Sequence, residues 1–175
     1  CEFRDSFLQL KPTVSVITNI EFEHVVYFGS LERENKSFNN FVNATKKESF
    51  ASFSCKKNIT PRGRKVHFVG AKTGLNAQNI TLCDDGKYSF DLYCKKDYIC
   101  NLKLNIYGKY NIQNALLAIA VARRFGVDIN IIQLAIRTYE SVHRRFEELG
   151  FFASNIVVQD YAHHPTEISC SINTC

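Results

Sequence analysis

The sequence predicts an α/β fold, because segments with the spacing of strands are interleaved with segments with the spacing of helices. Residues 13–20 (TVSVITNI) are β-branched and apolar, as expected of a buried strand. Residues 50–107 consist of short alternating segments divided by glycine, Asp-Gly or lysine pairs, which indicates strands and hairpins. Residues 111–126 (NIQNALLAIAVARRFG) have the apolar spacing of a helix. The order of these segments favours one α/β domain followed by a second unit that starts near Arg144.

The N-terminal part is expected to contain a strand and an amphipathic helix. Residues 13–20 follow Pro12 and form a continuous apolar run, so we expect a strand buried on both faces. The EFEH motif at 21–24 comes directly after it, at the end of the strand where open α/β sheets bind their ligands. Residues 30–44 place apolar side chains amid charge, which predicts a helix with Ser30 as its N-cap.

A β meander is expected in the middle of the chain. Its predicted strands are the four segments KVHFVG, NAQNITLC, KYSFDLYC and ICNLKLNIYG, which lie between residues 65 and 108. Asp85-Gly86, between the second and the third segment, is typical of a tight hairpin turn.

Two helices and two strands are expected in the remainder. The first helix ends at Gly126, and the second, over 128–140, has Asp128 as its N-cap. RRFEELGFF and NIVVQD then have the composition of strands. The following HHPTE segment could be a helix entry, with Thr166 as the cap and Glu167 in the first turn, as an alternative to a functional role.

Composition excludes several classes of protein. A net charge of +5 with scattered lysine pairs is too mild for a dedicated nucleic-acid binder. The seven cysteines lack C-x-x-C spacing, which argues against a zinc ribbon or a disulfide scaffold and favours reduced thiols. No apolar run is long enough to span a bilayer and no signal peptide is present, so we expect a cytoplasmic protein without membrane partners. The chain contains no methionine, from which we expect a piece of a longer protein.

The first candidate site lies around the EFEH motif. Glu21, Glu23 and His24 follow the first strand, where two carboxylates and an imidazole could hold Mg²⁺ with waters completing the shell. Histidine is an unusual Mg²⁺ ligand, so a role without metal stays open. Glu2 precedes a helical-looking segment, where an acid favoured by the helix dipole is the simple alternative to a ligand.

The second candidate site combines amides and arginines. Asn111 and Asn114 lie three residues apart, on one helix face, and an amide matches the donor and acceptor on the edge of adenine. Alternatively, both asparagines cap free N–H groups of the first helical turn. Arg145, in the Arg144-Arg145 pair, suits bidentate phosphate contact, although surface arginine pairs are also common.

The third candidate site is the segment VVQDYAHHPTEI. Asp160 follows a strand at its carboxyl end, where an acid can accept ribose hydroxyl groups. His163 and His164 are adjacent, so their side chains point in different directions and seldom share one metal ion. Metal binding, acid–base chemistry and a nucleotide pocket all remain open for this segment taken alone.

Five segments, taken in order, resemble a known family: CEFRDSFLQLKP, VITNIEFEH, GKYNIQNALLAIAVA, VHRRFEELG and QDYAHHPTEI. Their order and spacing are similar to those of the Mur ligases, and they span essentially the whole chain. The DYAHHPTE and RRFE segments, with the N-terminal CEFRDSF, favour the branch of this family that adds L-alanine over its sister branches.

The resemblance implies a parent protein of three domains. Residues 1–142 would be the later part of the central ATP-binding domain, and residues 143–175 the first strands of a Rossmann-like C-terminal domain. The UDP-binding domain and the glycine-rich phosphate loop would precede Cys1, so we expect the chain alone to be inactive.

The resemblance also implies a reaction and its cofactors. ATP and Mg²⁺ would serve a ligase of peptidoglycan precursor synthesis, which joins L-alanine to UDP-N-acetylmuramate through an acyl phosphate. Glu2 and His24 are similar to the family's Mg²⁺ ligands. Asn111 and Asn114 resemble the residues that bind adenine.

The C-terminal unit would contribute to both sides of the reaction. Arg145 resembles the arginine that reaches the γ-phosphate when the domains close, and Asp160 resembles an acid that contacts ATP; both are assigned to catalysis. Tyr161 and His163 would line the side that binds the substrates, UDP-N-acetylmuramate and L-alanine.

Three positions depart from the family pattern. The family usually has His at Tyr110, Asp at Val26 and Asp at Gln159. Two alternatives therefore stay open beside the alanine-adding ligase. One is another Mur-type ligase, of the murein-peptide recycling, cyanophycin or folylpolyglutamate kind, and the other is a non-catalytic remnant that acts as a folded interaction module.

Overall fold

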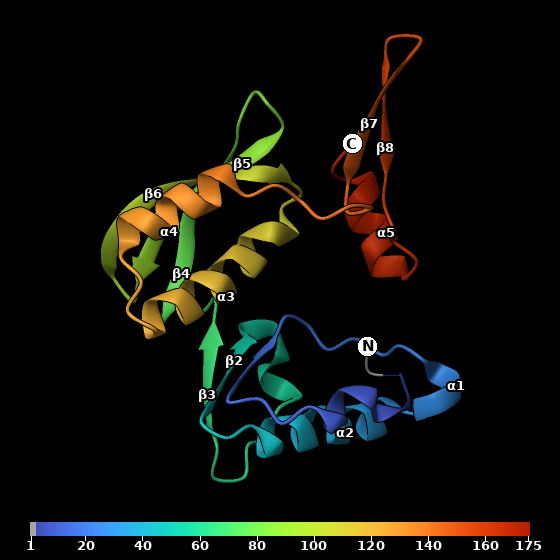
Figure 1. The fold of residues 1–175 in the computed structure, drawn as a ribbon, viewed down its shortest axis with the longest axis vertical. Coiled ribbons are helices and arrows are strands. Elements are labelled where there is room, and N and C mark those ends of the chain that lie inside the picture. Colours follow the sequence, from blue (N-terminus) through green and yellow to red (C-terminus); the bar gives the residue numbers. More distant parts are fainter. Residues whose placement is uncertain (1–2) are drawn as a thin grey trace.

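The computed structural model describes residues 3–175 and has the predicted α/β class (Figure 1). Its strands form a parallel sheet in the order β1-β2-β3, an antiparallel sheet in the order β4-β5-β6, and a separate hairpin, β7-β8. The parallel strands are β1 (Val14–Ile17), β2 (Glu48–Ser52) and β3 (Lys65–Val69). The antiparallel strands are β4 (Leu75–Leu82), β5 (Lys87–Cys94) and β6 (Asp97–Tyr107).

The parallel sheet corrects two predictions. The segment KVHFVG is a strand as predicted, but it is β3 and pairs with β2 in the parallel sheet instead of joining the meander. In β1 only one face is buried, because Ser15 and Ile17 are buried while Val16 is 45% exposed. The Val16 face is covered by the helix α3 (Tyr110–Arg124). This helix packs on β2 and β3 and leaves the edge strand β1 partly uncovered.

The helices of the N-terminal half pack on the other face of this sheet. A 3₁₀ helix, η1 (Phe3–Gln9), precedes β1; α1 (Val25–Phe28) and α2 (Leu31–Ala44) follow it, and η2 (Phe53–Lys57) follows β2. Ser30 caps α2 as predicted, since its Oγ accepts from the Arg33 N–H at 3.2 Å. Val42 of α2 packs with Ile17 and Ala51 in a small core.

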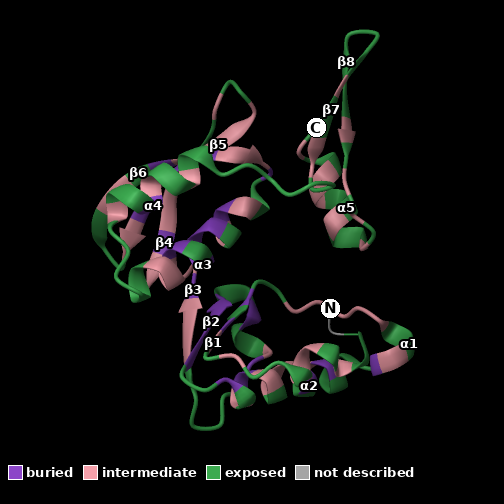
Figure 2. Cartoon of the chain, in the orientation of Figure 1, coloured by how far each residue is buried: buried purple, intermediate pink, exposed green. Residues whose placement is uncertain are grey.

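The helix α3 (Tyr110–Arg124) joins the two sheets (Figure 1). Its residues Ile112, Leu116 and Ile119 belong to one core with side chains of β2, β3 and the antiparallel sheet, which appears in purple in Figure 2. The next helix, α4 (Ile129–Thr138), lies along β6 and begins at Asp128, whose side chain accepts from the Asn130 N–H at 2.8 Å. Both helices and the Asp85-Gly86 turn are as predicted.

The C-terminal unit consists of β7 (Glu147–Phe152), β8 (Asn155–Gln159) and α5 (Pro165–Ile172). The hairpin β7-β8 projects away from the two larger sheets and is mostly exposed (Figures 1 and 2). The predicted cap of α5 is wrong: His164 occupies the N-cap, Pro165 the first position, and Thr166 lies inside the helix. Proline is favoured at that first position because its missing N–H would have no partner there, so the cap falls one residue before it.

None of the helices between residues 3 and 175 combines the length with the apolar character that crossing a membrane requires.

Candidate functional site

The EFEH loop leaves the carboxyl end of β1 and leads into α1. His24 takes the N-cap position of α1 in a left-handed conformation, with φ of 51°. Its carbonyl oxygen accepts from the Tyr27 N–H at 2.8 Å, and its ring lies 5.2 Å from the ring of Phe3. The loop therefore ends the strand sharply and fixes His24 at the edge of the sheet where ligands are expected.

Both glutamates of this loop face histidines of the C-terminal unit. Glu23 Oε1 lies 3.2 Å from His163 Nε2, and Glu21 Oε2 lies 3.4 Å from His164 Nδ1. These contacts join segments about 140 residues apart in the chain. We refer to the four residues as the histidine–glutamate clasp.

The clasp involves both carboxylates that the sequence offered as Mg²⁺ ligands. The sequence suggested that Glu21, Glu23 and His24 hold Mg²⁺ together, yet in the structure both carboxylates lie beside the histidines of the clasp. Among residues 3–175 no three His, Cys, Asp or Glu side chains are grouped as a metal site requires. Glu2, the other ligand that the family resemblance implies, lies outside the described residues, so the assignment of Glu2 and His24 stays a prediction.

The contacts of His163 favour its charged form. Its Nδ1 lies 2.9 Å from the carbonyl oxygen of Tyr161 and can only donate there, while its Nε2 faces the carboxylate of Glu23. The hydrogen bond to the Tyr161 carbonyl raises the pKa of His163, and the charges of Glu167 and Glu23 raise it further. Both ring nitrogens face acceptor oxygens, an arrangement that suits an imidazolium.

His164 has two competing contacts. Its Nδ1 lies 3.3 Å from the Thr166 backbone N–H, which it caps, and 3.4 Å from the carboxylate of Glu21. One nitrogen cannot accept the first contact and donate to the second at once, so the cap belongs to the neutral ring and the ion pair to the charged ring. Glu167 completes the capping box by accepting from the His163 and His164 N–H groups at 3.2 and 3.4 Å.

The two asparagines lie together on the first turn of α3, as predicted from their spacing. Asn111 Nδ2 donates to the Tyr107 carbonyl at 2.6 Å, and Asn114 Nδ2 donates to Asn111 Oδ1 at 3.0 Å. These amides therefore contact a carbonyl and each other, which differs from the capping role that the sequence left open. Asn111 is half-buried and orients the exposed Asn114 through their hydrogen bond.

Tyr110 lies between the asparagines and the C-terminal unit. Burial raises its pKa, and the negative charge of Asp160 raises it further. The hydrogen bond with Asn111 and the charge of Arg145 act in the opposite direction. The charges of Arg145 and Asp160 therefore act on Tyr110, the residue beside Asn111.

Arg145 and Asp160 are held within the C-terminal unit. Arg145 Nη1 lies 3.5 Å from Glu167 Oε1, a long contact, and the Ser171 hydroxyl donates to Asp160 Oδ2 at 2.5 Å. Tyr161 donates its backbone N–H to the Arg144 carbonyl at 2.8 Å, and its side chain is 59% exposed. Its ring packs edge-on against that of His163 at 5.2 Å.

The family departures occupy different surroundings. Val26 is fully exposed on α1, and Gln159 is exposed at the end of β8. Tyr110, in contrast, is 36% exposed and has a pKa that responds to the charges of Asp160 and Arg145.

Sequence reasoning missed the histidine–glutamate clasp. The two acids were considered only as metal ligands, and the two histidines only within their own turn. The acids after the first predicted strand and the histidines after the last one are chemically suited to pair. Nothing local in the sequence indicates that these two strand ends meet.

Comparison with known proteins places these residues in context. A family model described as the Mur ligase middle domain matches residues 4–122. The UDP-N-acetylmuramate–L-alanine ligases of Caldanaerobacter subterraneus subsp. tengcongensis and Caldicellulosiruptor bescii are 35% and 36% identical, over 98% and 99% of the chain. The matched parts are 39% and 40% of those proteins, so the chain spans about two fifths of their length.

Solved structures give a similar result. The UDP-N-acetylmuramate–alanine ligase of Thermotoga maritima has a TM-score of 0.78 at 25% identity, over 97% of this chain and 39% of that one. The UDP-N-acetylmuramate:L-alanyl-γ-D-glutamyl-meso-diaminopimelate ligase of Neisseria meningitides has a TM-score of 0.63 at 26% identity, over 79% of this chain and 43% of that one. MurF of Acinetobacter baumannii, with a TM-score of 0.80 at 19% identity over 96% of this chain and 38% of that one, shares the fold.

Proposed function

Because the chain belongs to the Mur ligase family, we propose that the whole protein is an ATP-dependent ligase of peptidoglycan precursor synthesis that joins L-alanine to UDP-N-acetylmuramate. One observation carries the choice of substrates: similarity to the alanine-adding ligases extends over 98–99% of the chain. It therefore reaches beyond the middle-domain match at 4–122 and includes the QDYAHHPTEI segment. Since ATP and nucleotide sugars are cytoplasmic metabolites, we also propose a cytoplasmic location.

The proposed reaction has two steps. The γ-phosphoryl group of ATP passes to a carboxylate oxygen of UDP-N-acetylmuramate, and ADP leaves. The amine of L-alanine then attacks the acyl carbon, the amide bond forms, phosphate departs with the acyl oxygen, and the nitrogen loses a proton. Both steps depend on positioning and on neutralising charge more than on an acid–base pair.

The ATP side would be formed by α3 and the C-terminal unit. Asn114, supported by Asn111, would read the edge of adenine. Asp160 would accept from the ribose hydroxyls. Arg145 would bind the γ-phosphate, and its long 3.5 Å contact with Glu167 is one that a more highly charged phosphate can replace.

The metal side would lie at the end of β1. Mg²⁺, when bound, supplies charge neutralisation between the ATP phosphates and the substrate carboxylate. Glu2 and His24 would hold it, and the carboxylates of Glu21 and Glu23 in the same loop are the oxygen donors that this ion prefers. Release of either carboxylate from the histidine–glutamate clasp would make it available.

The acceptor side would include Tyr161 and His163. The exposed Tyr161 ring packs on His163, and the clasp holds His163 against Glu23. A positive charge at this position would favour the approach of a substrate carboxylate.

Two domains meet in the proposed enzyme. We propose that residues 1–142 belong to the central ATP-binding domain and residues 143–175 to the start of the C-terminal domain. The boundary falls in the exposed connection between α4, which ends at Thr138, and β7, which begins at Glu147.

The test is phosphate release by the full-length protein with ATP. We expect release only when UDP-N-acetylmuramate, L-alanine and Mg²⁺ are all present, and none from the 175-residue chain alone. In a parallel reaction L-alanyl-γ-D-glutamyl-meso-diaminopimelate replaces L-alanine, because the ligase of Neisseria meningitides named for that peptide also has a similar structure. Phosphate release with the peptide but not with L-alanine would identify a recycling ligase. No release under any condition would contradict both the alanine-adding and the recycling activity.

A further inference from the structure

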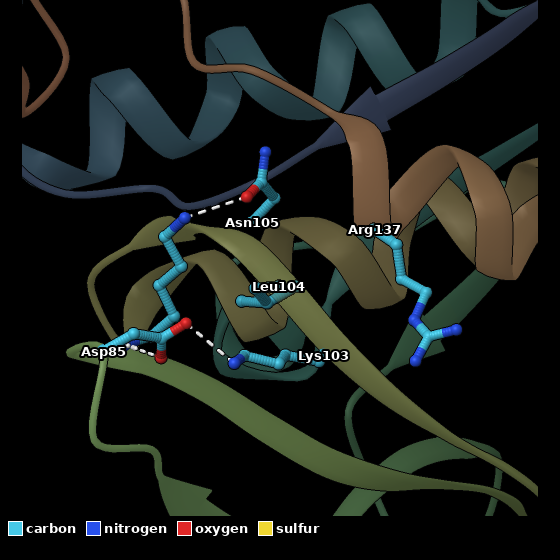
Figure 3. Close-up of a pocket in the computed structure, with 6 residues that line it drawn as sticks. Asp85, Lys103, Leu104, Asn105 and Arg137 are labelled. Atoms are coloured by element: carbon cyan, nitrogen blue, oxygen red, sulfur yellow. Dashed lines mark hydrogen bonds and ion pairs between the residues drawn. The ribbon is translucent and has the colours of Figure 1, made fainter.

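A hollow of about 220 Å³ lies between the strands β5 and β6 and the end of α4 (Figure 3). None of the residues of the candidate functional site lines it. The lining side chains are Asp85, Lys87, Lys103, Leu104, Asn105 and Arg137. We refer to it as the basic hollow.

Polar contacts hold two of its lysines in place. Lys103 Nζ lies 2.7 Å from Asp85 Oδ2, and Lys87 Nζ donates to Asn105 Oδ1 at 2.8 Å. The Asp85 carboxylate raises the pKa of Lys103, which stays charged. Two ammonium groups are therefore fixed at the strand side of the hollow.

Arg137 supplies the third cation from α4. Figure 3 shows it extending from the helix beside Lys103 and Leu104. Within residues 3–175 its guanidinium has no hydrogen bond or ion pair, in contrast to the two lysines. Its five N–H donors in a planar fork are suited to an oxyanion.

Charge and size together indicate the ligand. Three cations face a single carboxylate, so the lining has an excess of positive charge that a dianion would neutralise. The volume suits a phosphate group and is smaller than the roughly 300–1,000 Å³ of pockets that enclose drug-sized ligands. Leu104, which is 3% exposed, adds one apolar side chain to the lining.

We propose that the basic hollow binds a phosphate dianion, either inorganic phosphate or the phosphate group of a small metabolite. Arg137 binds it bidentately, and Lys103 and Lys87 approach from the opposite wall. Asp85 weakens the site, because its carboxylate repels the anion and competes for Lys103. The affinity is low, since Lys103 and Asp85 are each almost half exposed.

The test uses the ¹⁵N-labelled chain and NMR titration at pH 7.5 with sodium phosphate, against sodium chloride at equal ionic strength. We expect saturable shifts of the Arg137 Nε–H and of the amides of Leu104 and Asn105 with phosphate only. Arg137→Ala should weaken binding roughly three- to tenfold. The matched control Arg123→Ala removes an exposed arginine from α3 and should leave the affinity unchanged.

Asp85→Asn provides a second, opposite change. Asn-Gly suits the hairpin turn as well as Asp-Gly does, so the fold is kept while the repelling charge is lost. We expect tighter phosphate binding, by roughly threefold or more. A phosphate monoester in a separate titration distinguishes the sources, since binding of inorganic phosphate alone would indicate the free ion.

Chemical-shift changes that do not saturate with phosphate, or that are the same in Arg137→Ala, would overturn the proposed phosphate site. So would an unchanged or weaker affinity in Asp85→Asn. These outcomes are independent of ligase activity, because they are measured without ATP or substrates.

Discussion

Glu48, at the start of β2, is a buried carboxylate with two partners. It is 6% exposed, and its oxygens lie 2.7 Å from His67 Nε2 and 2.6 Å from Arg124 Nε. The hydrogen bond with His67 and the contact with Arg124 hold the pKa of Glu48 below its ordinary value, although burial acts in the other direction. The residue therefore links β2, β3 and α3 by electrostatics as well as by packing.

We expect Glu48→Gln to lower the free energy of unfolding by about 1–2 kcal/mol at pH 7, less than a fully buried pair because both partners are partly exposed. A folded-state pKa below the unfolded value of about 4.3 means that this stabilisation is complete above that pH and is lost as the pH falls through the folded pKa. Urea unfolding at pH 7 and below pH 4 measures both effects. Glu140→Gln, at an exposed position, should change little, and an equal loss in both variants would contradict the role of Glu48.

Gly108 determines how α3 begins. Its φ is 91°, and a Cβ at this position would lie 2.5 Å from Tyr110 Cε1. Tyr110 has a hydrogen bond with Asn111 and feels the charge of Asp160, so a displaced ring would disturb the candidate nucleotide site.

We expect Gly108→Ala to destabilise the chain by about 2–4 kcal/mol, from backbone strain plus the clash with Tyr110. Gly63→Ala is a matched control, because Gly63 also has a positive φ, of 71°, but nothing lies within 4 Å of its Cβ position. The control should cost only about 1–2 kcal/mol. Thermal unfolding of both variants measures the difference, and equal destabilisation would show that Tyr110 yields without cost.

The histidine–glutamate clasp connects two structural elements, the N-terminus of α5 and the loop after β1. It pairs Glu23 with His163 and Glu21 with His164 at the carboxyl ends of strands β1 and β8. A second contact between the units is the packing of the Tyr107 ring on Phe146, at 5.5 Å. Within residues 3–175 neither hydrophobic core includes a side chain of the C-terminal unit, so side-chain contacts such as these hold it to the central part.

We expect Glu23→Gln to lower the pKa of His163 towards the ordinary histidine value of about 6.5, because a nearby negative charge is lost. A raised folded-state pKa means that the clasp is fully formed below about pH 6.5 and weakens as the pH rises through the folded value. NMR titration of the histidine ring resonances measures the shift. Glu32→Gln, a change in the exposed first turn of α2, serves as the control; the same His163 pKa in both variants would show that Glu23 does not face it.

Across the chain, most helices and strands were predictable because the residues that mark them lie within or beside each element. Ser30, Asp128 and the Asp85-Gly86 turn mark their elements directly. Three features were not predictable in this way. β2 (ESFAS) contains a glutamate and two serines yet is buried throughout, β3 pairs in parallel with residues 17 positions upstream, and His164 caps α5 in place of Thr166.

The candidate site was predictable in part for the same reason. The spacing of Asn111 and Asn114 is a local property of a helix, and their mutual hydrogen bond follows from it. The contact between Glu23 and His163, and the effect of the Asp160 charge on Tyr110, depend on how two units dock, which no local pattern records. The candidate site is therefore formed by both units together.

Adenine recognition tests this arrangement in the full-length protein. We expect Asn114→Ala to weaken ATP binding about five- to tenfold, because one or two hydrogen bonds to the base are lost at an exposed side chain with little cost in stability. GTP, whose base edge reverses the donor and the acceptor, should bind weakly to both proteins. Asn40→Ala, in the exposed face of α2, is the matched control. The affinities are measured by calorimetric titration. The same ATP affinity for Asn114→Ala and for the control would show that the asparagine pair does not bind the base, and the adenine-binding residues would then lie elsewhere between the two units.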